Sequence, residues 1–216
     1  MSDQYNFIHI PKTGGTAIKY ALEDYSRPNI TFPDRGHSLK LSGVTNNACF
    51  VIRQPWLRFC SAYWERATME ERRRISENKD VKTFGYANLS ADEKRLLEKY
   101  TTPDELVTFL REGGRLTGIL GELTAPQTVW LGELPQYKKH EHKVKLVFAL
   151  KDLDKTMKNI FGMFLTRDPF KQRSRKLFDK QQSYDISPVN KDWFEQHRKH
   201  EYELLDYIRT REYFYE

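Results

Sequence analysis

Three stretches of the chain show the same order of apolar and polar positions: a short apolar run, a turn, and a run with apolar residues at helical spacing. In the first unit, the apolar run 5–10 precedes a helical pattern over 16–25. In the second, the run 48–52 precedes a helix that begins at Pro55, and in the third "VKLVFAL" precedes a helical pattern over 152–164. Strands that alternate with helices pair in parallel, so the pattern predicts an α/β fold with a mainly parallel sheet.

The remaining segments carry weaker patterns. "ERATMEERRRISENKDVK" is rich in charge and predicts a helix end followed by a variable insertion over about 66–102. "PDELVTFLRE" is a clearer helix, and a last helix is expected near 190–208. Because no repeat, low-complexity tract or linker divides the 216 residues, we expect a single domain over 1–216.

Charge narrows the classes of partner. The formal net charge of +6 and the pI near 9.1 indicate a surface that attracts anions, so a nucleic acid, a nucleotide and a sulfated or carboxylated glycan are all open at this point. The two cysteines fit small buried side chains better than a disulfide, which favours a reducing compartment. No run approaches the roughly 20 apolar residues that cross a bilayer, so we expect no membrane span and a cytoplasmic protein. The pattern does not indicate an oligomeric state.

The turn of the first unit, "PKTGGT", has the composition of a phosphate-binding loop. A helix N-terminus offers unpaired backbone N–H groups and about half a positive charge. Gly14 and Gly15 allow a phosphate to approach closely, Thr13 and Thr16 add hydroxyl groups, and Lys12 adds a cation. In the Walker pattern GxxxxGK[ST] the lysine follows the glycines, so an ordinary ATPase or GTPase is disfavoured. A glycine turn that merely joins strand to helix is the plainer alternative.

A second group of anion-binding side chains follows the second strand. In "RQPWLRFCSAY", Arg53 ends the strand, Ser61 lies two turns into the helix, and Arg58 stands between them. Arginine and serine together suit a second phosphate. Both groups would lie at carboxyl ends of strands, where open α/β sheets bind their ligands.

Taken together, the two motifs resemble those of a known family. "HIPKTGGT" resembles the 5′-phosphosulfate loop, and "VIRQPWLRFCSAY" resembles the 3′-phosphate motif R-[DN]-P-x-x-R-x-x-S-x-Y, of the sulfotransferases that use 3′-phosphoadenosine 5′-phosphosulfate (PAPS). The likeness is to the carbohydrate enzymes in particular, which include the heparan sulfate 2-O and 6-O sulfotransferases. Ala17 stands where the family often has serine, and Gln54 where it usually has Asp or Asn.

The resemblance implies a P-loop-like three-layer fold and transfer of a sulfuryl group from PAPS to a hydroxyl, or less readily an amine, of an acceptor. No metal is implied. Lys12 would stabilise the leaving 5′-phosphate, while Arg53 and Ser61 would hold the 3′-phosphate. The other residues that would hold the 5′-phosphate are Thr13, Gly14, Gly15 and Thr16.

A hydroxyl acceptor needs a base, and His37 is the first candidate. It lies in "RGHSLKLSG" between the two motifs, where the resemblance to the 6-O-like members implies a histidine base. An ordinary histidine has a pKa near ~6.5, which suits proton transfer at neutral pH. A surface-loop histidine is the plainer interpretation, and Asp34, Glu65 and Glu23 are the alternative bases.

Other residues bear on the acceptor and on competing functions. Tryptophans and two basic clusters would suit an acidic glycan, although core packing and solvation explain most of them. These are Trp64, Trp130, Trp193, Arg72–Arg74 and Arg173–Lys176. His140 and His142 could share a face and bind a metal, but a solvated charge run is the favoured interpretation. A nucleotide or small-molecule kinase and a non-catalytic module for an anionic nucleotide stay as alternatives, while no nucleic-acid-binding motif is present.

Overall fold

The protein is described by a computed structural model over residues 4–25, 30–31, 37–68, 89–162, 165 and 183–215. Contacts within the chain gather in two compact units. The first unit comprises Met1–Pro55, Pro126–Asp168 and Arg198–Glu216, and the second comprises Trp56–Ala125 and Pro169–His197. The expected single domain over 1–216 stays a prediction.

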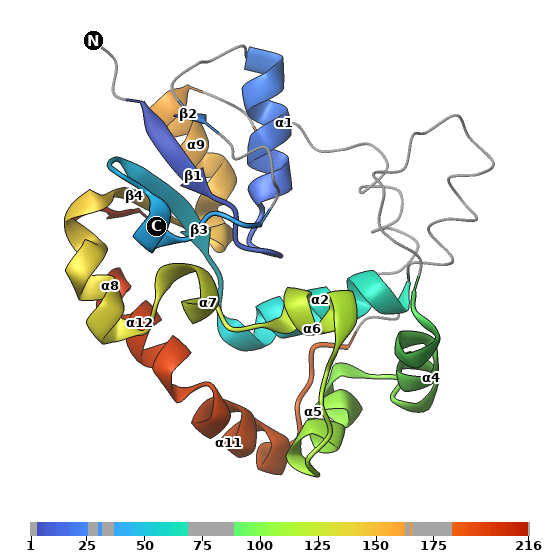
Figure 1. Cartoon of the computed structure of the whole chain (residues 1–216). Helices are drawn as coiled ribbons and strands as arrows, with labels where there is room; N and C mark the ends of the chain where they lie inside the picture. The colour runs from blue at the N-terminus through green and yellow to red at the C-terminus, as the bar shows by residue number, and fades with distance from the viewer. Residues whose placement is uncertain are drawn as a thin grey trace. The chain divides into compact units, whose positions relative to one another are not determined.

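The first unit is built on a parallel sheet of five strands in the order β2-β1-β3-β4-β5 (Figure 1). The strands are β1 (Tyr5–Ile8), β2 (Ile30–Thr31), β3 (Ala48–Ile52), β4 (Val144–Ala149) and β5 (Phe214–Tyr215). The predicted parallel α/β fold is therefore confirmed. From β1 the chain continues to β2 at one edge of the sheet, and from β3 it continues to β4, toward the opposite edge. The carboxyl ends of β1 and β3 thus flank the reversal of strand order at which open α/β sheets bind ligands.

Helices cover both faces of this sheet. α1 (Gly15–Tyr25) and α9 (Leu153–Phe161) pack on one face, where Phe7, Val51 and Phe148 form a core with Ile18 and Met157. Alternate strand residues point to the other face. On that side lie α7 (Thr128–Leu131), α8 (Leu134–His140) and α12 (Lys199–Arg209), which pack together (Figure 1). The result is a helix–sheet–helix arrangement within the first unit.

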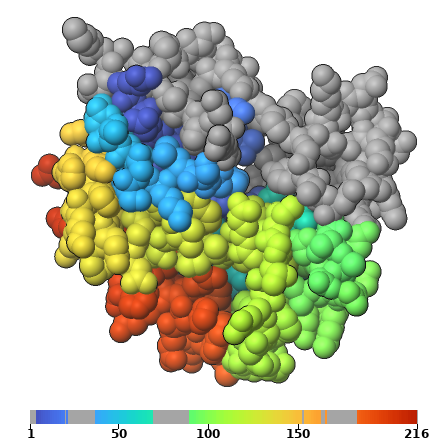
Figure 2. All heavy atoms as spheres, in the orientation of Figure 1, coloured from blue at the N-terminus to red at the C-terminus, as the bar shows by residue number. Residues whose placement is uncertain are grey.

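Short 3-10 turns connect these elements: η1 (Leu41–Gly43), η2 (Glu141–Lys143) and η3 (Leu150–Asp152). η1 packs against α7 and α8. On the face shown in Figure 2, atoms of the segment that includes η1 (light blue) lie at the surface beside those of α8 (yellow). The segment 37–47 therefore runs along the first unit, from His37 to the start of β3.

The second unit is helical. It contains α2 (Pro55–Ala67, apart from its first residue), α4 (Ala91–Lys99), α5 (Pro103–Arg111), α6 (Gly118–Thr124) and α11 (Pro188–His197). Its core is aromatic, since Trp56 and Phe59 stack and the ring of Phe194 packs edge-on against both. α4 and α5 each begin with a capping box, at Ser90 and Thr102, in which a glutamate three residues on returns the hydrogen bond.

Several element boundaries differ from those expected from the sequence. The last helix is two helices, α11 and α12, because Arg198 between them has a non-helical backbone (φ −105°, ψ 14°). α9 ends at Phe161 because Gly162 takes a left-handed conformation (φ 63°) and its N–H bonds to the carbonyl of Lys158. Within the expected insertion, 91–99 form α4, and 69–88 lie outside the described residues.

Both cysteines are free and buried, as expected. Burial raises the pKa of the Cys49 thiol well above its ordinary value, so this side chain behaves as a small apolar group. None of the helices in the described parts of the chain has both the length and the apolar character needed to span a bilayer.

Candidate anion-binding site

The loop between β1 and α1 has an unusual backbone. Lys12 takes a left-handed conformation (φ 66°), which is costly for a residue with a Cβ, and Gly14 takes another (φ 93°). Side chains fill the space beside the two glycines. A Cβ on Gly14 would lie 2.6 Å from Leu150 Cδ1, and one on Gly15 would clash with the ring of His9. The loop is therefore held in one tight shape, with strain stored at the lysine.

This shape leaves backbone donors at the start of α1. The N–H groups of Ala17 and Ile18 both bond to the carbonyl of Gly14. For the N–H groups of Gly14, Gly15 and Thr16, no acceptor occurs among the described residues. Together with the positive end of the helix dipole, these groups favour an anion.

The two threonines of the loop differ. Thr13 is fully buried, and its hydroxyl donates to the carbonyl of Ile10 (2.9 Å). Its hydroxyl proton therefore fixes the turn, and its remaining donor toward a phosphate is the backbone N–H. Thr16 is half-buried at the start of α1. The expectation that both hold a phosphate stays a prediction.

Arg53 joins the end of β3 to the loop. Its Nη1 donates to the carbonyl of Lys12 (3.2 Å), and this bond supports the left-handed lysine. The backbone of Arg53 is in turn held by the side chain of Gln127, which accepts from its N–H (3.1 Å) and donates to its carbonyl (2.7 Å). Arg53, just beyond the carboxyl end of β3, thus contacts the backbone of Lys12 in the loop that follows β1.

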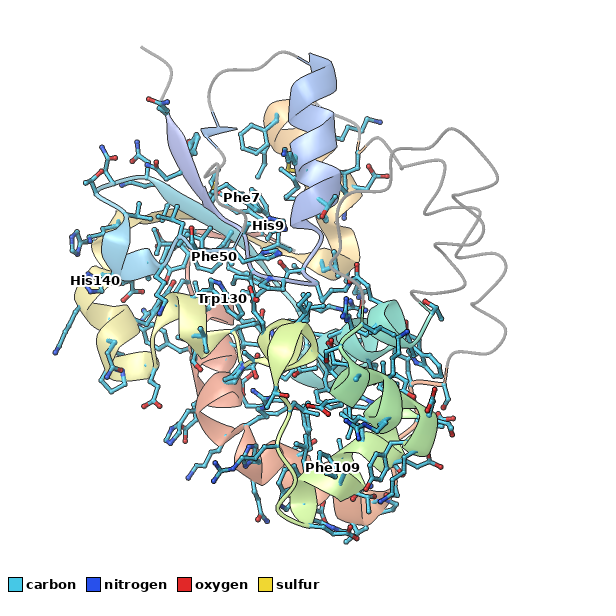
Figure 3. All side chains as sticks on the ribbon, turned by 45° about the vertical axis from the view of Figure 1, so that its right-hand side comes forward. Phe7, His9, Phe50, Phe109, Trp130 and His140 are labelled. Atoms are coloured by element: carbon cyan, nitrogen blue, oxygen red, sulfur yellow. The ribbon has the colours of Figure 1, made fainter. Side chains whose placement is uncertain are left out.

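His37 lies beside the loop as well. Its Nδ1 is 2.9 Å from the carbonyl of His9, and the two imidazole rings are 4.3 Å apart. A carbonyl only accepts, so Nδ1 carries the proton of this bond, and in the neutral ring Nε2 is the proton acceptor. The indole N–H of Trp130 donates to the carbonyl of His37 (2.6 Å). Figure 3 labels the two residues to which His37 is bonded, His9 at the end of β1 and Trp130 on α7.

The rest of the predicted 3′-phosphate motif belongs to the second unit. Ser61 is half-buried on α2. Arg58 is buried and donates to the carbonyls of Leu123, Thr124 and Ala125, so it caps the C-terminal end of α6. Tyr63 is also buried, and its hydroxyl donates to the carbonyl of Tyr100. Arg58 and Tyr63 therefore have structural roles within that unit, and the pairing of Ser61 with Arg53 stays a prediction.

Of the three alternative bases, the structure describes the side chain of one. Asp34 lies outside the described residues, as does the side chain of Glu23. Glu65 is 7% exposed on α2, in the second unit. Of the two candidates whose side chains the structure describes, His37 is the one that lies beside the lysine loop within the first unit.

The other side chains considered from the sequence have local partners. The indole of Trp64 donates to the carbonyl of Ser183, and Trp193 stacks on His197. The arginine clusters at 72–74 and 173–176 lie outside the described residues. His140 lies at the end of α8, apart from His9 (Figure 3), and the described residues contain no group of three His, Cys, Asp or Glu side chains arranged to hold a metal ion.

Comparison with family models, with curated proteins and with solved structures gives no match for this chain. The function therefore has to be argued from the residues themselves.

Proposed function

We propose that this protein is a sulfotransferase that moves a sulfuryl group from PAPS to a hydroxyl group of an acceptor, with a carbohydrate as the first acceptor to test. The observation that carries the proposal is the position of three candidates near the carboxyl ends of β1 and β3, where Arg53 bonds to the carbonyl of Lys12 and His37 bonds to the carbonyl of His9. Each was a candidate from the sequence alone. Because β1 and β3 are neighbours, the loops that follow them share the end of the sheet at which open α/β sheets bind their ligands.

The donor set of the loop suits a phosphate. Backbone N–H groups of Gly14, Gly15 and Thr16 lie at the positive end of α1. Lys12 is a movable cation on a fixed backbone. In the proposed function this loop holds the 5′-phosphate, and Arg53 holds the 3′-phosphate.

When bound, PAPS supplies an activated sulfuryl group on its 5′-phosphate. As the acceptor oxygen bonds to sulfur, the bond from sulfur to the 5′-phosphate oxygen breaks, and that oxygen leaves with the electron pair. Lys12 and the loop N–H groups stabilise the negative charge that develops there. His37 accepts the acceptor's hydroxyl proton at Nε2, while its Nδ1–H stays bonded to the carbonyl of His9.

The test is transfer of label from ³⁵S-labelled PAPS to a panel of oligosaccharides, simple alcohols and amines, with a parallel arm of ³²P-labelled ATP and magnesium. We expect ³⁵S in a hydroxyl acceptor, with a much lower rate for Lys12→Ala and normal transfer for Lys19→Ala, an exposed lysine of α1. Transfer of ³²P in place of ³⁵S would identify a kinase and overturn the proposal. Binding of the nucleotide without transfer to any acceptor would favour the non-catalytic module.

A further inference from the structure

Gln127 pairs with Arg53 in a way that local structure does not demand. Its Oε1 accepts from the N–H of Arg53 and its Nε2 donates to the carbonyl of the same residue, at 3.1 and 2.7 Å. One amide side chain thus occupies both backbone groups just beyond β3, as a neighbouring strand would. It fixes the position and direction of the residue that carries the guanidinium.

Gln127 is itself held by a buried carboxylate. Glu201, near the start of α12, accepts from both the backbone N–H and the Nε2 of Gln127 through Oε1, each at 2.9 Å. Gln127 is fully buried and Glu201 is 2% exposed. A carboxylate offers only acceptors, so the amide has one orientation: nitrogen toward Glu201 and the carbonyl of Arg53, oxygen toward the N–H of Arg53.

These hydrogen bonds continue to the loop between β1 and α1. Glu201 fixes Gln127, Gln127 fixes the backbone of Arg53, and the guanidinium of Arg53 bonds to the carbonyl of the left-handed Lys12. All four residues belong to the first unit. Burying a carboxylate is costly, and an apolar side chain of similar volume often serves stability as well. The charge of Glu201 is paired through Oε2 with Nη1 of Arg198 (4.0 Å), while its Oε1 orients Gln127.

We propose that Gln127, locked by Glu201, is a positioning residue for Arg53, and that the pair sets the preference of the site for a nucleotide with two separate phosphates over one with a single phosphate. The inference rests on the proposed function for the identity of the ligand. It assigns Gln127 and Glu201 no contact with the ligand. Their effect passes through the direction of the Arg53 guanidinium.

The test compares two changes at one position. Glu201→Leu removes the acceptor that orients Gln127, whereas Glu201→Gln keeps an oxygen that accepts from it, and Glu203→Gln is an exposed control on the same helix. Affinities for adenosine 3′,5′-bisphosphate and for AMP are measured by calorimetry well below the melting temperature. We expect Glu201→Leu to lower the bisphosphate-to-AMP ratio by about 10- to 100-fold, the usual value of a hydrogen bond to a charged group, and Glu201→Gln to restore most of it.

If Glu201 had a structural role alone, Glu201→Leu would weaken the binding of both nucleotides equally and leave the bisphosphate-to-AMP affinity ratio unchanged. That result would overturn the inference. An equal fall of this affinity ratio in Glu201→Gln and Glu201→Leu would also overturn the inference, because the oxygen that accepts from Gln127 would then not matter. Should Glu201→Leu not fold, Gln127→Met, which keeps a similar volume without the amide, is measured in its place.

A second readout separates this inference from the proposed function. The Nε–Hε NMR signal of Arg53, assigned with Arg53→Lys, is recorded without ligand. We expect a rigid signal in the unaltered protein and in Glu201→Gln, and a signal averaged by motion in Glu201→Leu. If the unaltered protein binds neither nucleotide, the proposed function fails, and the NMR result still decides whether Glu201 positions Arg53: an unchanged signal in Glu201→Leu overturns that role.

Discussion

Lys12 combines two roles that substitution can separate. Its left-handed backbone costs about 1 kcal/mol or more for any residue with a Cβ, while its charged amine is proposed to stabilise the leaving 5′-phosphate oxygen. Glycine relieves the backbone strain and alanine does not, but both remove the amine.

We therefore expect Lys12→Gly to have a free energy of unfolding about 1 kcal/mol higher than Lys12→Ala. Both variants should lose turnover to a similar extent, by about 10²-fold or more. Urea denaturation gives the first comparison and initial rates with PAPS give the second. If Lys12→Gly kept near-normal turnover, the amine would have no catalytic role.

His37 is tested through its ring nitrogens. With Nδ1–H donating to His9, Nε2 is the basic atom, so His37→Ala should fold and bind the bisphosphate normally. Turnover with a hydroxyl acceptor should fall by about 10²- to 10⁴-fold, and the acidic limb of the pH–rate profile should disappear. An unchanged profile would remove His37 as the base and would leave the roles of Lys12 and Arg53 intact.

At the scale of elements, α4 is tied into the second unit through one carboxylate. Glu93 accepts from Arg66, from the N–H of Ser90 and from the N–H of Leu120. Burial acts to raise its pKa, but the hydrogen bonds from Ser90, Leu120 and Arg66 prevail, and its pKa is lowered. The ionised form is thus the stabilising one.

Glu93→Gln should lower the free energy of unfolding at neutral pH by about 3 kcal/mol, because it removes the negative charge that accepts two hydrogen bonds from the buried Arg66. A folded-state pKa below the unfolded one stabilises the protein above the unfolded pKa of about 4.3, and this contribution is lost as pH falls through the folded value. The gap between the two proteins in urea denaturation should therefore narrow below about pH 4. A gap independent of pH would contradict this role, and Asp92→Asn, which alters an exposed carboxylate of the same helix, is the control.

Much of the fold could be predicted at this scale. β3 has the predicted bounds and α1 begins one residue early, because local apolar periodicity and the glycine turn decide both. The helix break at Arg198 and the short strands β2 and β5 depend on tertiary contacts and carry little local signal. The candidate site could likewise be predicted only in part. Its cations lie in sequence motifs, whereas Gln127 is 74 residues from Arg53 and Glu201 is 74 residues from Gln127, so neither could be found from spacing alone.

For the whole molecule, the net charge of +6 and the β1–β3 edge both favour an anionic ligand. Charge alone does not choose among nucleotides. In the proposed function, the loop after β1 holds the 5′-phosphate and Arg53, after β3, holds the 3′-phosphate, so a nucleotide with both phosphates is expected to bind more tightly than AMP.

The measurement that tests this most directly is the thermal stabilisation of the protein by adenosine 3′,5′-bisphosphate, compared with AMP and ATP, with and without magnesium, because it requires no knowledge of the acceptor. The account predicts a larger rise in melting temperature for the bisphosphate than for AMP or ATP, independent of magnesium and growing with ligand concentration as mass action requires. The preference should be lost in Arg53→Ala. A larger rise with ATP that appears only when magnesium is present, or no rise with the bisphosphate at any concentration, would contradict the central claim.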